Sequence, residues 1–165
     1  MESKAKLFGH PIHPMLIVFP LGLFIMAVLA DIAYVITDHS AFAVVAYWDI
    51  AGGIVGGLLA AVFGFIDWLA IPNKTRAKSI GLYHGIGNVV VVLLFAVSWL
   101  TRRPVKGHLP SLAASVLGVV GVGLGAVTGW LGGELVHRLA VGVDDGAHLD
   151  APSSLGGEPA RPRAR

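Results

Sequence analysis

Residues 80–100 read IGLYHGIGNVVVVLLFAVSWL and contain no formally charged side chain. A helix needs about 20 consecutive apolar residues to cross the hydrocarbon core of a bilayer. This stretch reaches that length, so it predicts a membrane-spanning helix.

Three further stretches are apolar and long enough to span a bilayer: residues 15–36, 47–71 and 109–133. The segments between the four stretches are short and polar: residues 37–46, 72–79 and 101–108. Helices joined by such short loops run antiparallel and pack beside each other. The sequence therefore predicts an all-α integral membrane protein, an up-down four-helix bundle.

The composition of the whole chain agrees with a lipid environment. Only 13% of its 165 residues are charged, and its mean hydropathy is +0.76. A soluble domain carries about 25% charged residues, so this chain has too few solvated groups to cover a folded surface in water. The absence of cysteine excludes disulfides, iron–sulfur clusters and thiolate zinc sites. A net charge of +2 with scattered basic residues predicts no nucleic-acid partner.

The chain changes character after the fourth span. Residues 144–165 are rich in Gly, Pro, Ser and charged residues, which cannot bury enough apolar surface to fold alone. We expect residues 1–143 to form one four-span transmembrane domain, followed by a flexible polar C-terminal tail. The first span is longer than the usual 7–15-residue apolar core of a signal peptide, so we expect it to be retained.

Basic residues near the ends of the spans predict the orientation. Nine of the twelve Lys and Arg residues lie on the side that holds both termini, and Arg102, Arg103 and Lys106 lie on the other. Segments rich in Lys and Arg stay in the cytoplasm, so both termini should be cytoplasmic. We call the side with the termini the near side and the opposite side the far side. Asp31 and Asp49 lie toward the far side, where they could pair with Arg102 or Arg103 in a structural role.

Small residues recur at helical spacing in two of the spans. In the fourth span they are Gly121, Gly125, Gly129 and Gly133, and in the second they are Gly53, Gly57, Ala60 and Gly64, continued by Asp67. Small residues let membrane helices approach closely, so these stripes should mark the inward faces of both spans. Packing within one chain, a homodimer interface and a flat ligand such as a macrocycle would each use them.

Ionisable residues gather at the near end of all four spans. They are His10, His13, Asp67, His84, Glu134 and His137. Such groups are costly within a membrane and usually face the interior or a cavity. His84 and Asn88 are four residues apart, so they lie on one side of their helix. We therefore expect these side chains to converge.

Histidines on separate helices can be axial ligands of haem iron, or can join carboxylates around a divalent transition metal. The candidate ligands are His10, His13, His84 and His137, and the candidate groups that orient them are Asp67, Asn88 and Glu134. Two other interpretations remain open. His13 and His84 could simply bond to Asp67 and to backbone carbonyls and tie helix ends together, or the cluster could form a proton or ion path. The sequence shows no serine triad, phosphate loop or nucleotide-binding fingerprint.

The segments that carry these residues resemble a known family. They are HPIHPMLIVFPLGL (residues 10–23), GFIDWLAIP (64–72), TRAKSIGLYHGIGN (75–88) and GWLGGELV (129–136). They are similar to a bacterial membrane family catalogued as domain of unknown function 2231, over nearly the whole chain up to the tail. The resemblance implies a four-helix integral membrane protein without an established activity. It carries over His10, His13, Asp67, His84 and Asn88 as candidate positions, whereas the histidine that many members have at position 18 is Val18 here.

The resemblance also bears on function. Some members look fused to, or encoded with, Rieske-type iron–sulfur domains, which implies electron transfer. We therefore expect a bacterial inner-membrane protein that is a haem- or metal-binding electron-transfer subunit, with haem b or a divalent transition metal at the near end. The alternative is a non-enzymatic membrane scaffold with a structural polar cluster. The expected partners are membrane lipid and either a second copy in a homodimer or a redox partner protein.

Overall fold

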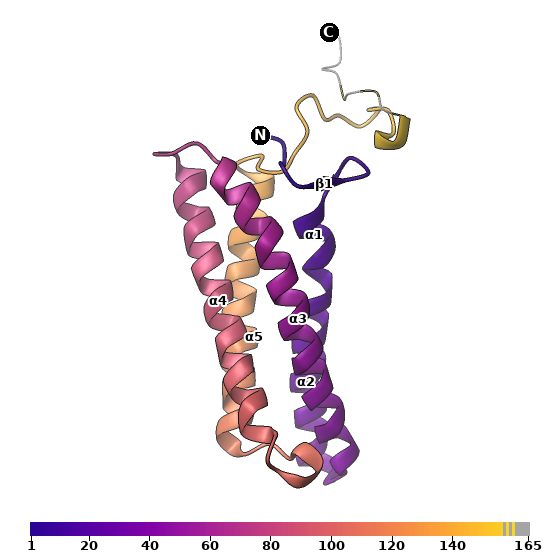
Figure 1. The fold of residues 1–165 in the computed structure, drawn as a ribbon, viewed down its shortest axis with the longest axis vertical. Coiled ribbons are helices and arrows are strands. Elements are labelled where there is room, and N and C mark those ends of the chain that lie inside the picture. Colours follow the sequence, from indigo (N-terminus) through magenta and orange to yellow (C-terminus); the bar gives the residue numbers. More distant parts are fainter. Residues whose placement is uncertain (157, 159, 161–165) are drawn as a thin grey trace.

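A computed structural model describes residues 1–156, 158 and 160 of the chain. Four long helices form the body: α2 (Val18–Thr37), α3 (Ser40–Ala70), α4 (Arg76–Arg102) and α5 (Leu112–His137). The short elements are β1 (Lys6–Leu7), β2 (His10–Pro11), α1 (Ile12–Leu16) and the 3-10 turns η1 (Lys106–His108) and η2 (Ser154–Gly156). The long helices run alternately up and down, and the described parts of both terminal segments lie at one end (Figure 1).

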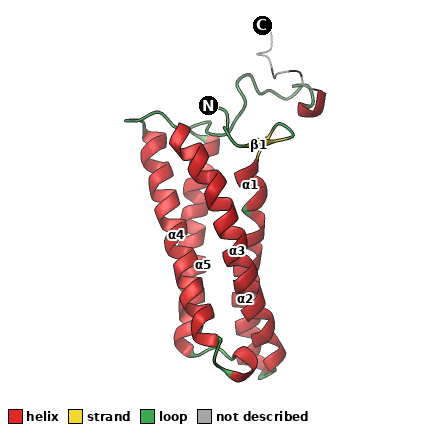
Figure 2. Cartoon of the chain, viewed as in Figure 1, coloured by secondary structure: helices red, strands yellow, loops and turns green. Residues whose placement is uncertain are grey.

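Each long helix is apolar and long enough to cross a membrane, with α1 and α2 counted together as Ile12–Thr37. The expected all-α four-helix membrane bundle is confirmed, and the chain is a multi-pass membrane protein. Almost everything between the two ends is helix, and the loops lie at the ends (Figure 2).

The first inter-helix loop is much shorter than predicted. Residues 37–46 were expected to be a polar loop, and this is wrong because α3 already begins at Ser40. Asp38 makes the turn alone by adopting a left-handed conformation with φ of 55°, which a short polar side chain tolerates better than most. The apolar residues after Ser40 then extend α3 toward the far end.

The helices pack as two hairpins. Contacts are densest between α2 and α3 and between α4 and α5, and sparser between α3 and α4 and between α2 and α5. The rings of Phe24 and Phe95 join the hairpins in the middle of the bundle, stacked with centroids 3.9 Å apart. Glycines make room for both rings, because a Cβ on Gly53 would lie 2.5 Å from Phe24 and one on Gly121 would lie 2.7 Å from Phe95.

The predicted inward faces of the two glycine stripes differ in how well they agree with the structure. On α3 the inward face is confirmed, since Gly53, Gly57 and Gly64 all face side chains of other elements. On α5 it is wrong beyond Gly121, because no described atom lies within 4 Å of a Cβ placed on Gly125 or Gly129. The spacing explains the difference. Steps of four turn a stripe by about 40° each, whereas alternating steps of four and three keep it on one face.

An ion pair closes the far end of the bundle. Arg102 donates to both carboxylate oxygens of Asp31, at 2.7 and 2.6 Å, and the two side chains are only 1% and 5% exposed. Ser98 accepts a further bond from Arg102 and donates to the Ala114 carbonyl. The expected pairing of Asp31 with Arg102 is confirmed, whereas Asp49 makes no ion pair within the described residues.

The two terminal segments lie against each other at the near end. The Met1 ammonium group donates to the Ala140 carbonyl, and Lys6 pairs with Asp144. The division into residues 1–143 and 144–165 stays a prediction. Of the tail that was expected to be flexible, residues 157, 159 and 161–165 lie outside the described part of the chain.

The Asp31–Arg102 pair gives a stability test. Asp31→Ala should lower the free energy of unfolding by about 3–5 kcal/mol, because it leaves the Arg102 charge buried without its partner. The double variant Asp31→Leu with Arg102→Met removes both charges, so it should recover most of that loss. Both are measured by SDS-induced unfolding in mixed micelles, followed by circular dichroism. A double variant as unstable as the single one would show that the charge is not the cause.

Candidate functional site

His13 lies in α1, where its ring packs against α3. Its Nδ1 lies 2.9 Å from the carbonyl oxygen of Ala60. A carbonyl only accepts, so Nδ1 carries the proton and donates it. Gly64 leaves the space that the ring fills, because a Cβ there would lie 2.8 Å from Nδ1 of His13.

His84 repeats this arrangement in the other hairpin. Its Nδ1 donates to the carbonyl of Thr128 on α5 at 2.8 Å. A Cβ on Gly132 would lie 3.1 Å from its Cε1. In both hairpins, therefore, an imidazole of one helix donates to a carbonyl of the next, and a glycine four residues after that carbonyl gives the ring room.

The two imidazoles meet across the interface between the hairpins. Their ring centroids are 6.1 Å apart and their planes are inclined by 83°. His13 and His84 are both partly buried. The structure thus brings together the two histidines that the sequence singled out, at the near end of the bundle and from different hairpins.

Asn88 and Thr128 complete the polar surroundings of His84. The amide nitrogen of Asn88 donates to the His84 carbonyl at 2.8 Å and lies 3.4 and 3.3 Å from the two ring nitrogens. Because this nitrogen lies almost equally far from the two ring nitrogens, it is directed at neither of them. Its well-formed hydrogen bond is the shorter one to the backbone carbonyl. The Thr128 hydroxyl lies 3.1 Å from the Asn88 side-chain oxygen and 3.0 Å from the Gly125 carbonyl, which accept its one proton.

Nδ1 donates in both rings, so a neutral imidazole has its lone pair on Nε2. Nε2 of His13 has no hydrogen-bond partner among the described residues. Nε2 of His84 has only the shared approach of the Asn88 amide. Each ring is therefore held by one nitrogen, while its other nitrogen can serve as a ligand.

The acidic candidates have other partners. Asp67 accepts bonds from the Ser3 hydroxyl and from the backbone N–H groups of Lys4 and Ala5. It therefore fastens the N-terminal segment to α3, and within the described residues it bonds to neither histidine. Glu134 pairs with Arg76 at 2.6 Å and so joins α5 to α4.

The other two histidine candidates lie apart from the pair. His10 is exposed in β2, and its Nε2 lies 3.3 Å from the Ser154 hydroxyl. His137 is exposed at the end of α5. It follows Gly133 by four residues, so it continues the glycine spacing that turns away from the interior of the bundle.

These positions decide which kinds of metal centre fit. Within the described residues, no group of three or more His, Cys, Asp or Glu side chains could hold a metal ion. A bare divalent ion in a protein typically takes four or more ligands, so the expected ring of histidines and carboxylates does not form. Haem supplies four ligands itself and needs only one or two from the protein, a number that the two histidines reach.

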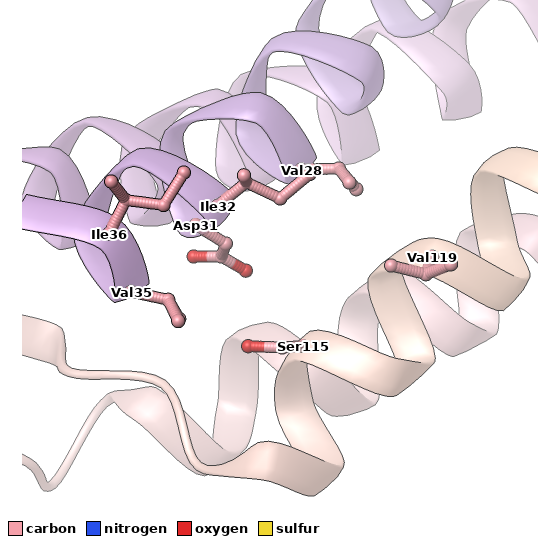
Figure 3. A pocket seen from close by; sticks show the side chains of 7 residues that line it. All are labelled: Val28, Asp31, Ile32, Val35, Ile36, Ser115 and Val119. Atoms are coloured by element: carbon pink, nitrogen blue, oxygen red, sulfur yellow. The ribbon is translucent and has the colours of Figure 1, made fainter.

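A groove at the other end of the bundle is a separate feature. It lies between α2 and α5 and is lined by Val28, Asp31, Ile32, Val35, Ile36, Ser115 and Val119 (Figure 3). Its walls are almost wholly aliphatic, and Arg102 already neutralises the Asp31 carboxylate. No histidine lines it, so the His13–His84 pair remains the candidate site.

Sequence reasoning offered backbone carbonyls as partners of His13 and His84 but did not identify which ones, and it missed Gly132. Every residue has a carbonyl, so nothing in the residue types marks those of Ala60 and Thr128 as acceptors. Gly132 carried a usable signal, because it follows Thr128 by four residues just as Gly64 follows Ala60.

Comparison with known proteins identifies the family. Residues 9–145 match the family model described as Predicted membrane protein (DUF2231). The match covers most of the chain and all four spans, so the chain belongs to this family. Searches of the curated proteins and of the solved structures found no match.

The glycine behind His13 can be tested against a matched glycine. Gly64→Ala should lower the free energy of unfolding by about 1–3 kcal/mol, because the new methyl group overpacks the ring. Gly129→Ala faces open space, so it should change stability little or raise it slightly. Both variants are compared by SDS-induced unfolding in the same micelles. Equal effects would mean that the ring is not held at Gly64.

Proposed function

We propose that His13 and His84 are the axial ligands of one haem b, and that the protein is an electron-transfer subunit of the bacterial inner membrane. The observation that carries the proposal is the pair itself. Two imidazoles from different hairpins lie close together in an edge-to-face arrangement, each with its Nδ1 bonded to a backbone carbonyl.

The hydrogen bonds support the proposal because they prepare both rings for ligation. Histidines that bind metals almost always donate their other ring N–H to a carbonyl, carboxylate or water, which fixes the tautomer and raises ligand basicity. Both imidazoles make such a bond before any ligand arrives, so little reorganisation is needed to bind iron.

The spacing of the rings also supports it. A metal–imidazole bond is about 2 Å long, which puts the centroids of two rings on opposite sides of one metal ion roughly 6 Å apart. The observed separation is 6.1 Å. The inclination of 83° is compatible with this arrangement, because each ring can rotate about its own bond to the metal.

The pair lies between hairpins that contact each other less closely than the helices within each hairpin do. When bound, haem supplies one-electron chemistry. His13 and His84 would hold the group through Nε2, and the one-electron chemistry that it would supply is the basis for proposing electron transfer. A redox partner protein would then exchange electrons with it.

The alternative function is a non-enzymatic membrane scaffold. A specific observation favours it: the two imidazole bonds tie α1 to α3 and α4 to α5 within the chain itself. The same bonds serve both functions, so the two proposals differ only in what Nε2 does.

The orientation belongs to the same proposal. The near end carries most of the basic residues close to the spans, and such segments remain cytoplasmic. The haem would then lie toward the cytoplasmic side of the inner membrane, with both termini on that side.

A visible spectrum tests the haem. The protein is expressed with a haem precursor, purified in mild detergent, and examined for a Soret band and for one haem per chain by the pyridine haemochrome assay. His13→Ala and His84→Ala should each abolish stoichiometric binding. His39→Ala should leave it unchanged, because His39 lies at the opposite end of the bundle.

The same variants distinguish the scaffold. If the pair is only structural, the protein stays colourless with added haem, and His13→Ala and His84→Ala lower the free energy of unfolding without any spectral change. A haem that survives both substitutions would rule out these residues as its ligands.

Orientation is tested with single cysteines, because the chain has none of its own. In intact spheroplasts, a membrane-impermeant maleimide should label Lys106→Cys on the far side. It should label Lys74→Cys only after the membrane is permeabilised. The reverse pattern would place the termini outside the cytoplasm.

A further inference from the structure

The segment before α1 forms a β-hairpin. β1 and β2 are antiparallel, with Lys6 opposite Pro11 and Leu7 opposite His10. The two residues of the turn have positive φ angles, 50° at Phe8 and 82° at Gly9. Positive φ at both central positions is the pattern of a type I′ turn, which normally has Asn or Asp before the Gly.

Phe8 is an unfavourable residue for the left-handed conformation. The Ser154 hydroxyl donates to its backbone carbonyl at 3.1 Å, but the Phe8 side chain remains exposed. The side chain of Phe8 is 73% exposed and that of Leu7 is 46% exposed. The hairpin therefore exposes two large apolar side chains, that of Leu7 at the end of β1 and that of Phe8 in the turn. Exposed apolar side chains of this size indicate an apolar partner, because the described residues of the chain leave them uncovered.

The position of the hairpin indicates that environment. In Figure 1 it lies level with the near ends of α3, α4 and α5 and projects sideways from the top of α1. The near ends of spanning helices lie at the headgroup region of a bilayer. Below the hairpin, exposed apolar residues continue along α1 and α2, including Met15, Val18 and Phe19. The tip thus extends the lipid-facing surface.

The ion pairs of the hairpin also favour a lipid environment. Lys6, the basic residue of the hairpin strands, pairs with both Glu2 and Asp144. The strands therefore present little free charge to an acidic partner, and the tip itself is apolar. This favours the boundary between headgroups and acyl chains over a charged protein surface.

We infer that the hairpin is an interfacial anchor whose tip, Leu7 and Phe8, inserts into the near-side leaflet. Its partner is the lipid bilayer itself. The anchor fixes the level at which the chain enters α1, and His13 follows β2 by two residues. It holds whether or not the histidine pair binds haem.

Depth measurements test the anchor on the full chain. Phe8→Cys is labelled with a nitroxide and reconstituted into phosphatidylcholine vesicles. Relaxation by oxygen, which concentrates in lipid, is compared with relaxation by a water-soluble nickel complex. Leu21→Cys, exposed in α2, is the lipid control, and Leu149→Cys, fully exposed in the C-terminal segment, is the water control.

The label at position 8 should be several-fold more accessible to oxygen and several-fold less accessible to nickel than the label at position 149. Leu7→Cys provides a second reporter if the first variant does not reconstitute. Nickel accessibility at both positions equal to that at position 149 would overturn the anchor. Protection from both reagents would also overturn it, because the tip would then be covered by another copy of the chain.

Discussion

The lack of water in the hydrocarbon core constrains how the buried polar side chains of this bundle are paired. A polar group there must find its partner inside the protein. His13 and His84 do so through the carbonyls of Ala60 and Thr128, and Arg102 does so through Asp31 and Ser98. The two imidazole bonds and the Asp31–Arg102 pair each join one helix to another, so satisfying these polar groups also holds the helices together.

The bundle separates its polar groups into two layers. The imidazoles lie toward the near end, the Asp31–Arg102 pair lies toward the far end, and the stacked rings of Phe24 and Phe95 lie between them. Glycines in α3 and α5 let these rings meet by removing the side chains that would separate the hairpins. The apolar middle therefore fixes the distance between the hairpins, and that distance in turn sets the separation of the two imidazoles.

The sequence predicted what depends on hydropathy and on helical period. Four spans, their alternation and the convergence of His13 with His84 follow from apolar length and from height in the membrane. It failed where rotation about a helix axis matters, since repeated steps of four carried Gly125 and Gly129 away from the interior. It also failed for Asp67, because only the folded chain shows that Ser3 and its neighbours reach that carboxylate. Contacts between a terminal segment and a helix leave no periodic signal.

The residue type at the two positions bears on the choice between scaffold and haem protein. A tie from one helix to a carbonyl of the next needs only a single donor, which the smaller hydroxyl group of Ser or Thr also supplies. The chain instead uses imidazole twice, and accommodates it with glycine twice, at Gly64 and Gly132. Each ring brings an Nε2 lone pair that a tie does not require and that lipid penalises. A ligand bound through Nε2 would give these two atoms a partner, and this is the point on which the proposed haem protein and the scaffold differ.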